Sequence, residues 1–176
     1  MEERIAVVNE ENRFIRWEGR RAIHEHRLLH RSVYILVFNT KGELLTQLRH
    51  RDKQTYPLYW DISVAGHVCA EDYHAGPDDD VDQVYRLTGE RELAEELGIT
   101  APMRRLGHFG PTATHYEQIR LFGVQSDGPI TIQEAEVEAV QWVSPAAFRA
   151  MLNDPEARIT ESLRRFGVWG LDNNCW

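Results

Sequence analysis

The stretch GERELAEELGI, residues 89–99, determines how the rest of this sequence is interpreted. At about 100° per residue, Glu92, Glu95 and Glu96 share one face of a helix. Like charges at this spacing destabilise an isolated helix by roughly 0.2–0.5 kcal/mol per pair. The adjoining stripe contains Leu93 and Leu97. We therefore expect the leucines to face the core and the acids to face a rim, where a divalent cation would relieve the repulsion.

A solvated helix face with excess charge is the simpler explanation of such a run of acids. Two features count against it. The predicted helix contains no lysine, so only Arg86 and Arg91 can pair with its acids at helical spacing. The motif Arg-Glu-Leu-X-Glu-Glu-Leu-Gly-Ile is also compact. Because Mg²⁺ prefers carboxylate oxygens and keeps several waters, this face suits a metal site shared with phosphate groups.

The composition narrows the class of protein. The chain has 176 residues, enough for one domain, and its 42% hydrophobic and 27% charged content is that of a globular protein. A net charge of −8 disfavours nucleic-acid binding, which relies on many Lys and Arg contacts. The longest apolar run, 33–38, is too short for a bilayer, and the acidic N-terminus is no signal peptide. Two cysteines, Cys69 and Cys175, suit a reducing cytoplasm.

Strand and helix patterns alternate on both sides of the acidic helix. Strands are expected in a hairpin at about 5–20 with a turn at 9–12, in a second hairpin of 33–38 and 44–48, at 60–66, within 101–126 and at 138–143. A short helix or a turn is expected at 21–29, and helices are expected from about 80 to 97 and from Ser144 onward. This order predicts an α/β fold with a mixed sheet and flanking helices. We expect one domain over 1–176, with a C-terminal helix and tail at about 144–176.

The motif from Arg91 to Ile99 resembles the second half of the Nudix box. In that pattern Gly, five residues, Glu and seven residues precede Arg-Glu-aliphatic-X-Glu-Glu-X-Gly-aliphatic, and every specified position of the second half matches. The resemblance implies a Nudix-type α/β/α sandwich. It also implies that Glu92, Glu95 and Glu96 bind Mg²⁺ or Mn²⁺ and help activate water for cleavage of a diphosphate linkage. Arg91 would be a structural ion-pair partner in the catalytic helix.

The first half of the box departs from the family pattern. Its glycine is best placed at Gly66, and Arg91 then follows after twenty-five positions instead of fourteen. The first glutamate of the box would fall at Asp72. The alternatives are Asp78, Asp79, Asp80 and Asp82, for most of which a helix-cap role is favoured. The lengthened loop, Cys69–Asp79, either shapes the substrate pocket or is a solvent-exposed insertion.

A closer resemblance, over about residues 5–150, is to the branch of the Nudix superfamily related to isopentenyl-diphosphate isomerase. It is carried by NEENRFI (9–15), LLHRSVYILVFNTKGELLTQLRHRDKQTYPLYWDISVAGHV (28–68) and EVEAVQWVSP (136–145). In the isomerases a Cys-Gly-His stands where this chain has Ala65-Gly66-His67, and the Cys is a catalytic acid/base. Alanine cannot transfer a proton, so the resemblance favours hydrolysis over isomerisation.

Further site residues follow from the same resemblance. Arg49 and Lys53 match the basic pair that holds the diphosphate, with Arg51 between them, and such cations clamp phosphate oxygens. A solvated basic hairpin is the alternative. Gly66 and His67 are expected to contact the substrate.

The resemblance also implies metal ligands outside the acidic helix. His30 and His67 match two metal-ligand histidines of the isomerases, although structural or substrate-contacting roles are equally compatible with the sequence. Glu117 matches a further acidic metal ligand. Trp60 could stack on a base or an apolar group, although a large aromatic after a proline is more often part of the core.

These features predict a Mg²⁺-dependent hydrolase that cleaves a diphosphate linkage in a small substrate such as a nucleoside di- or triphosphate. One alternative is an isomerase-like enzyme, which Ala65 disfavours. The other is a non-catalytic Nudix-fold protein that binds its ligand without cleaving it, which the complete Arg91–Glu96 set disfavours. We expect a cytoplasmic protein with a small-molecule diphosphate as its partner and no nucleic-acid or membrane partner.

Overall fold

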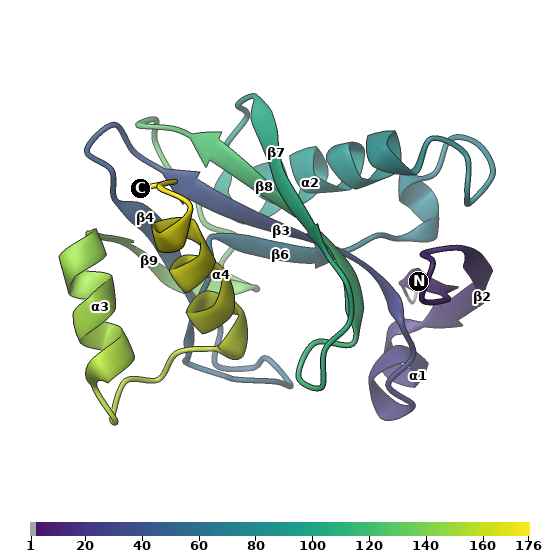
Figure 1. The fold of residues 1–176 in the computed structure, drawn as a ribbon, viewed down its shortest axis with the longest axis horizontal. Helices are drawn as coiled ribbons and strands as arrows, with labels where there is room; N and C mark the ends of the chain where they lie inside the picture. Colours follow the sequence, from purple (N-terminus) through teal and green to yellow (C-terminus); the bar gives the residue numbers. More distant parts are fainter. Residues whose placement is uncertain (1–2) are drawn as a thin grey trace. The chain divides into compact units, whose positions relative to one another are not determined.

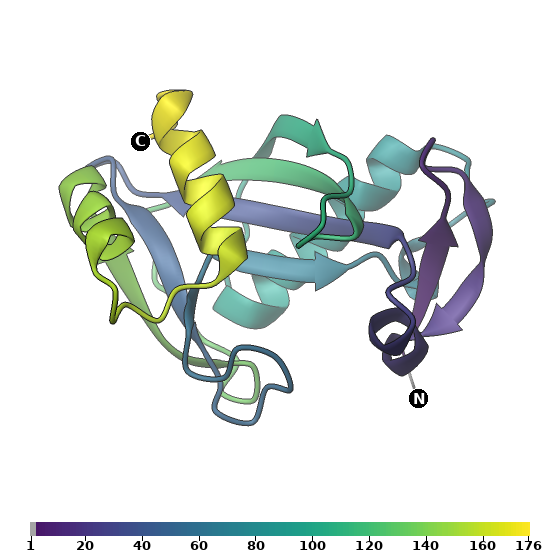
Figure 2. The same cartoon turned by 60° about the horizontal axis from the view of Figure 1, so that its bottom comes forward.

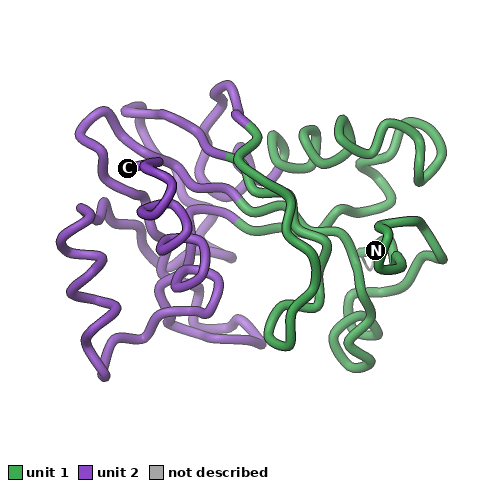
Figure 3. The backbone as a smooth tube through the Cα atoms, viewed as in Figure 1, with its two compact units in different colours: residues 1–34, 65–91, 105–122 green, residues 35–64, 92–104, 123–176 purple. Residues whose placement is uncertain are grey.

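A computed structural model describes residues 3–176 and has an α/β fold with a mixed β-sheet and flanking helices, as predicted (Figure 1). The chain divides into two compact units (Figure 3). Unit 1 comprises residues 1–34, 65–91 and 105–122, and unit 2 comprises 35–64, 92–104 and 123–176. Among the described residues, no helix combines the length and apolarity needed to cross a membrane.

The elements follow in the order expected for alternating strands and helices. The strands are β1 (Arg4–Val8), β2 (Phe14–Gly19), β3 (His30–Phe38), β4 (Leu44–Arg49), β5 (Trp60–Asp61), β6 (Val64–His67), β7 (Met103–Phe109), β8 (Glu117–Gln125) and β9 (Val137–Val143). The helices are α1 (Arg20–Glu25), α2 (Val81–Leu97), α3 (Pro145–Asn153) and α4 (Glu161–Asp172), and a 3-10 helix covers Ala70–Asp72. Strands β3, β6, β7 and β8 and helix α2 each contribute residues to both units.

In unit 1 the predicted N-terminal hairpin is present, with β1 and β2 antiparallel. Strand β1 also pairs with β3 through Val7 and His30. The side chains of Ile5, Ile23 and Cys69 pack in one buried cluster with Val7. Because Cys69 begins the lengthened loop, this cluster fixes the start of the loop against the hairpin.

A buried arginine anchors the rest of that loop. Arg31, with no exposed surface, donates from Nε to Asn12 Oδ1 at 2.9 Å and from Nη1 to the Tyr73 hydroxyl at 2.8 Å. Its Nη2 donates to Asp78 Oδ1 at 2.8 Å, and the guanidinium also bonds the Pro77 carbonyl. Charge-assisted bonds of this kind are about twice as strong as neutral ones. The lengthened loop is therefore tied to the turn of the N-terminal hairpin.

In unit 2, strand β4 lies between β5 and β9. Gln47 pairs with Asp61 and Leu48 with Trp60, while β9 pairs antiparallel along the length of β4. Helices α3 and α4 lie side by side in both ribbon views (Figure 2). Their fully buried side chains are Phe148, Leu163 and Phe166. These aromatic and aliphatic groups form the helical part of the core of unit 2.

The single strand predicted over 60–66 is wrong, because the structure has two short strands, β5 and β6, separated by Ile62 and Ser63. The Ser63 hydroxyl accepts from Val37 N at 2.8 Å and donates to Leu45 O at 2.6 Å. The backbone N–H of Ile62 donates to the Asp61 carboxylate at 2.9 Å. Short polar side chains thus take hydrogen bonds that a continuous ladder would need.

The C-terminal segment contains two helices where one helix and a tail were expected. Thr160 caps α4 by accepting from Leu163 N at 3.1 Å. The buried positions of α4 are Leu163, Phe166, Gly167 and Gly170, at spacings of three, four and seven. This pattern and its Thr cap are sequence signals for a second helix.

We predict that Arg31→Met lowers the free energy of unfolding by about 2–4 kcal/mol, because Asn12 and Asp78 lose their buried donor. Urea unfolding monitored by circular dichroism measures the change. The matched control is Arg21→Met, since Arg21 is exposed and its ion pair with Glu25 spans 3.8 Å. That control is expected to change stability by less than about 1 kcal/mol. Equal stabilities of the two variants would contradict the anchoring role of Arg31.

Candidate functional site

Helix α2 has the limits and the apolar stripe that the sequence predicts. Asp80 precedes it and accepts from Gln83 N at 3.3 Å, which is one half of the expected capping box. Gly98 ends it in the left-handed region, with a φ of 65°. Leu93 and Leu97 are 1% and 0% exposed. The leucines therefore orient the acidic face, as expected.

The three glutamates of that face differ in exposure. Glu95 is exposed, whereas Glu92 and Glu96 are only 8% and 7% exposed, so the expectation that all three line an open rim is wrong. At i, i+4 spacing, Glu92 and Glu96 flank the buried leucine stripe closely enough to be covered with it. Partial burial raises the free energy of the charged carboxylates, so a bound cation would stabilise this face more than an exposed one.

Glu96 is a carboxyl group of this face with a strongly raised pKa. Its Oε2 accepts from Gln47 Nε2 at 2.8 Å, and the same nitrogen donates to Ser63 O at 3.0 Å. Burial raises the pKa of Glu96 to about 7, while the Gln47 bond and the charges of Lys53 and Arg49 oppose part of that rise. A neutral amide donor alone does not compensate a buried carboxylate, so this oxygen is poised to accept a proton or a cation.

The three cations expected to clamp the diphosphate each have an acidic partner in unit 2. Arg49 donates to Asp61 Oδ2 at 3.0 Å and to the Thr55 carbonyl from Nε and Nη2. Arg51 pairs with Glu138, and Lys53 pairs with Glu136. Arg49 thereby shapes the loop after β4. A phosphate would have to compete with these carboxylates for the cations.

Arg91 has the ion-pair partner that the box pattern suggested. Its Nε and Nη2 donate to Asp72 Oδ1 and Oδ2 at 2.8 and 3.0 Å, which is a bidentate pair. Asp72 Oδ2 also accepts from Cys69 N at 2.9 Å. Asp72, at the position where the resemblance places the first glutamate of the box, is buried and is the acidic partner of Arg91.

The other aspartates of the lengthened loop have different partners. Asp78 accepts from Arg31 and from Phe14 N, and Asp79 accepts from Gly76 N. Asp80 caps α2, and Asp82 bonds the side chains of Arg105 and Arg120. Asp80 has the helix-cap role that was favoured for most of them, whereas Asp78 and Asp79 bond other segments, so for these two that prediction is wrong. Tyr73 is half-buried against Trp17, with ring centroids 5.2 Å apart, and His74 is exposed.

In unit 1 the structure brings together His30, His67 and Glu117, which we call the histidine–glutamate cluster. One ligand atom from each lies within 4.8 Å of the others. His30 Nε2 is buried without a hydrogen-bond partner and lies 3.4 Å from Glu117 Oε1. Two ligand atoms about 2.1 Å from one ion are roughly 3.4 Å apart at a tetrahedral angle. The orphaned nitrogen and this spacing fit a divalent metal ion.

Charges around the cluster favour metal binding at neutral pH. Burial raises the pKa of Glu117, but the neighbouring imidazoles of His30 and His67 and the Tyr34 hydroxyl outweigh it and lower that pKa to about 2. Burial lowers the pKa of His67, and burial with the neighbouring histidines lowers that of His24 to about 4. Neutral imidazoles and an ionised carboxylate are the forms that ligate metals.

Sequence reasoning missed several residues around these groups. Ser32 and Tyr34 donate to Glu117, and Gln47 donates to Glu96. His24 lies with its ring centroid 5.5 Å from that of His67. The sequence offered one indication that Ser32 and Tyr34 lie beside His30, which is their alternation with it along an apolar strand.

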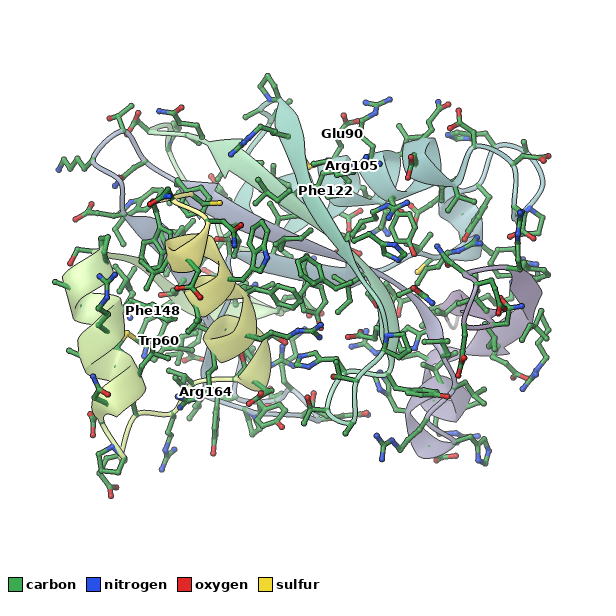
Figure 4. All side chains as sticks on the ribbon, viewed as in Figure 1. Trp60, Glu90, Arg105, Phe122, Phe148 and Arg164 are labelled. Atoms are coloured by element: carbon green, nitrogen blue, oxygen red, sulfur yellow. The ribbon has the colours of Figure 1, made fainter. Side chains whose placement is uncertain are left out.

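Two further residues named in the sequence analysis, Gly66 and Trp60, belong neither to the acidic face of α2 nor to the histidine–glutamate cluster. Gly66 is half-buried on β6 beside His67. Trp60 is half-buried and lines an open groove of about 570 Å³ with Gln141 and Met151 (Figure 4). Trp60 pairs with Leu48 of β4, and Glu96 bonds the neighbouring Gln47. Successive residues of a strand face opposite sides, so Trp60 and Glu96 lie on different faces of β4.

The raised pKa of Glu96 predicts how stability depends on pH without metal. A folded chain with a raised carboxyl pKa binds more protons than the unfolded chain, so stability falls as the pH rises from about 4.5 to about 7. Glu96→Gln removes the charge and keeps an oxygen for Gln47. In chelator at pH 8, we expect this variant to exceed the wild type by at most about 3 kcal/mol.

Chemical unfolding at pH 5 and pH 8 measures this effect. Glu90→Gln is the control, because exposed Glu90 pairs with Arg86 on the surface of the same helix. A Glu96→Gln protein that is less stable than the wild type at pH 8 would refute the prediction.

Comparisons with known proteins agree with the arrangement of the acidic helix. The sequence profile of the NUDIX domain matches residues 28–163. An uncharacterised Nudix hydrolase of Pseudomonas aeruginosa is 33% identical over 145 residues, covering 81% of this chain and 79% of that protein. The uncharacterised Nudix hydrolase YfcD of Salmonella typhi is 31% identical over 167 residues, covering 94% and 83%.

Solved structures share the fold. The protein DR0079 of Deinococcus radiodurans has a TM-score of 0.75 at 22% identity and covers 99% of both chains. The NUDIX domain of Shewanella oneidensis NrtR, solved with ADP ribose, has a TM-score of 0.54 at 19% identity and covers 74% of this chain and 79% of that one. With the profile matching most of its length and relatives above 30% identity, this chain belongs to the Nudix hydrolase family.

Proposed function

We propose that this Nudix hydrolase is Mg²⁺-dependent and cleaves a diphosphate linkage in a small substrate such as a nucleoside di- or triphosphate. The acidic face of α2 is the observation that carries the proposal. Glu92 and Glu96 are buried and Glu95 is exposed on one helix face, and the hydrogen bond that Glu96 accepts comes from the neutral amide of Gln47. Such a face is costly without a cation.

Glu92, Glu95 and Glu96 would hold the ion, with Mn²⁺ as an alternative to Mg²⁺. A metal bound there polarises phosphoryl oxygens and lowers the pKa of an attacking water. A carboxylate of the same face takes the proton from that water. The bidentate ion pair between Arg91 and the buried Asp72 holds the helix in place.

The basic side chains of unit 2 would bind the diphosphate. Arg51 is largely exposed, so its guanidinium can exchange Glu138 for a phosphate. Lys53 would exchange Glu136 for a phosphate in the same way. Arg49 is held by Asp61 and Thr55 and mainly fixes the loop after β4. The ADP ribose of the NrtR structure supports a nucleoside-diphosphate class of substrate.

The histidine–glutamate cluster would hold a second divalent ion. Two imidazoles and one carboxylate favour a transition metal such as Zn²⁺ or Mn²⁺ over Mg²⁺, which prefers oxygen ligands. His67, also expected to contact the substrate, would be a ligand here. The resemblance to the isomerase branch supports this assignment.

Two further predictions of the sequence are retained as proposals. We regard residues 1–176 as one Nudix domain, because the NUDIX profile contains residues of both compact units. We also retain a pocket-shaping role for the lengthened loop, which contains the exposed His74 and follows the strand that carries Gly66. Its anchoring by Arg31 would make it a fixed wall of such a pocket.

Glu92→Gln, Glu95→Gln and Glu96→Gln are each expected to lower kcat/KM on the order of 100-fold or more with the fold retained. Phosphorus NMR of nucleoside di- and triphosphates with Mg²⁺, and again with excess chelator, measures turnover and its products. Glu90→Gln is the matched control on the same helix and is expected to keep full activity. Full activity of all three variants, or of the wild type in chelator, would sink the proposal.

The isomerase alternative makes a separate prediction. Purified protein supplied with isopentenyl diphosphate and either Mg²⁺ or Mn²⁺ should yield no allylic isomer, because Ala65 cannot transfer a proton. Proton NMR of the reaction mixture detects the isomer. Its formation at an enzymatic rate would reverse this assignment.

A further inference from the structure

Strand β3 supplies one member of the histidine–glutamate cluster and two hydroxyl groups beside it. His30, Ser32 and Tyr34 stand at i, i+2 and i+4, so their side chains share one face of the strand. All three are buried, with exposed fractions of 5%, 0% and 6%. A single strand face therefore carries a candidate ligand and two hydrogen-bond donors.

Both hydroxyls act on Glu117. Ser32 Oγ donates to Oε1 and Tyr34 OH donates to Oε2, each at 2.8 Å. An ionised carboxylate only accepts hydrogen bonds and has about four lone-pair positions. One donor on each oxygen prevents the carboxylate from rotating. The remaining lone pairs of Oε1 then face His30 Nε2, which is 3.4 Å away.

The imidazoles are held from outside in a comparable way. His30 Nδ1 lies 2.8 Å from the Leu28 carbonyl, which leaves Nε2 as the free ring nitrogen. His67 Nδ1 lies 3.8 Å from the Glu3 carboxylate. Histidines that ligate metals almost always direct the other ring nitrogen to a carbonyl or carboxylate.

We propose that Ser32 and Tyr34 are positioning residues that orient Glu117 as a metal ligand toward His30 and His67. The inference rests on the proposed second metal ion of this cluster. Removing either hydroxyl leaves the carboxylate free to turn away from the imidazoles. Loss of such an outer contact lowers metal affinity about 10–100-fold in metal sites generally, and we expect a loss in that range here.

Titration of the full chain with Co²⁺, followed by visible absorption and calorimetry, tests the proposal. The signal that disappears in His67→Ala reports binding at the cluster and separates it from binding at the acidic face of α2. Ser32→Ala and Tyr34→Phe are expected to raise the Kd of that signal about 10–100-fold and to change its absorption bands. Ser32→Thr retains a hydroxyl and is expected to restore the affinity.

Tyr85→Phe is the matched control, because it removes a buried hydroxyl that donates to Gln118 O at 3.0 Å and leaves the donors of Glu117 intact. It is expected to bind Co²⁺ as the wild type does. If Ser32→Ala unfolds, Tyr34→Phe gives the comparison, because it removes the hydroxyl on the other oxygen of Glu117 and keeps the ring.

Two results would overturn the inference, and they are distinguishable. Unchanged Kd and bands in Ser32→Ala and Tyr34→Phe would reject the positioning role and leave the metal site in place. No His67-dependent signal in the wild type would reject the metal at the cluster, and the positioning role with it. The Mg²⁺ chemistry proposed for the acidic face would be untouched by either result.

Discussion

Burial of carboxylates is the constraint on which the chemistry of this protein depends. An ionised carboxyl group loses most of its hydration when it is covered, and its environment must replace that hydration or change its pKa. Unit 1 provides Glu117 with two hydroxyls and two imidazoles, and its pKa falls to about 2. Unit 2 provides Glu96 with an amide and more distant cations, and its pKa rises to about 7.

These two solutions lead to different functional properties. The two hydroxyls hold both oxygens of Glu117, so little would have to be reorganised if an ion bound there as proposed. The buried charge of Glu96 would be stabilised by a cation. In the absence of metal, it makes the folded protein less stable than one with a neutral side chain at this position. Stability sacrificed at a site of this kind is the usual trade-off with activity.

The position of the acidic helix depends on interactions in the segment between Gly66 and Arg91. Asp72 pairs with Arg91 in a bidentate geometry and also accepts from Cys69 N, although its side chain is one methylene shorter than the expected glutamate. Arg31 holds the following segment through Tyr73 and Asp78. Polar contacts therefore anchor this segment at its beginning and at its end.

Local patterns in the sequence determined the elements of this protein. The spacing of Leu93 and Leu97, the residues around Asp80 and the stop at Gly98 define α2, because capping and amphipathic periodicity are properties of neighbouring residues. The box motif likewise indicated Arg91 and the three glutamates. The interruption at Ser63 was missed because its hydroxyl bonds Val37 and Leu45, which lie far away in the sequence.

Only the tertiary structure decided which side chains meet and how deeply they are covered. Asp72 was one of five candidates for the partner of Arg91, and the pairing depends on the path of the whole loop. The burial of Glu96 beside Gln47, and the contacts of Ser32 and Tyr34 with Glu117, join residues from 49 to 85 positions apart. Hydrogen bonding and desolvation act through space, so a periodic pattern can supply the charges of a site but not their environment.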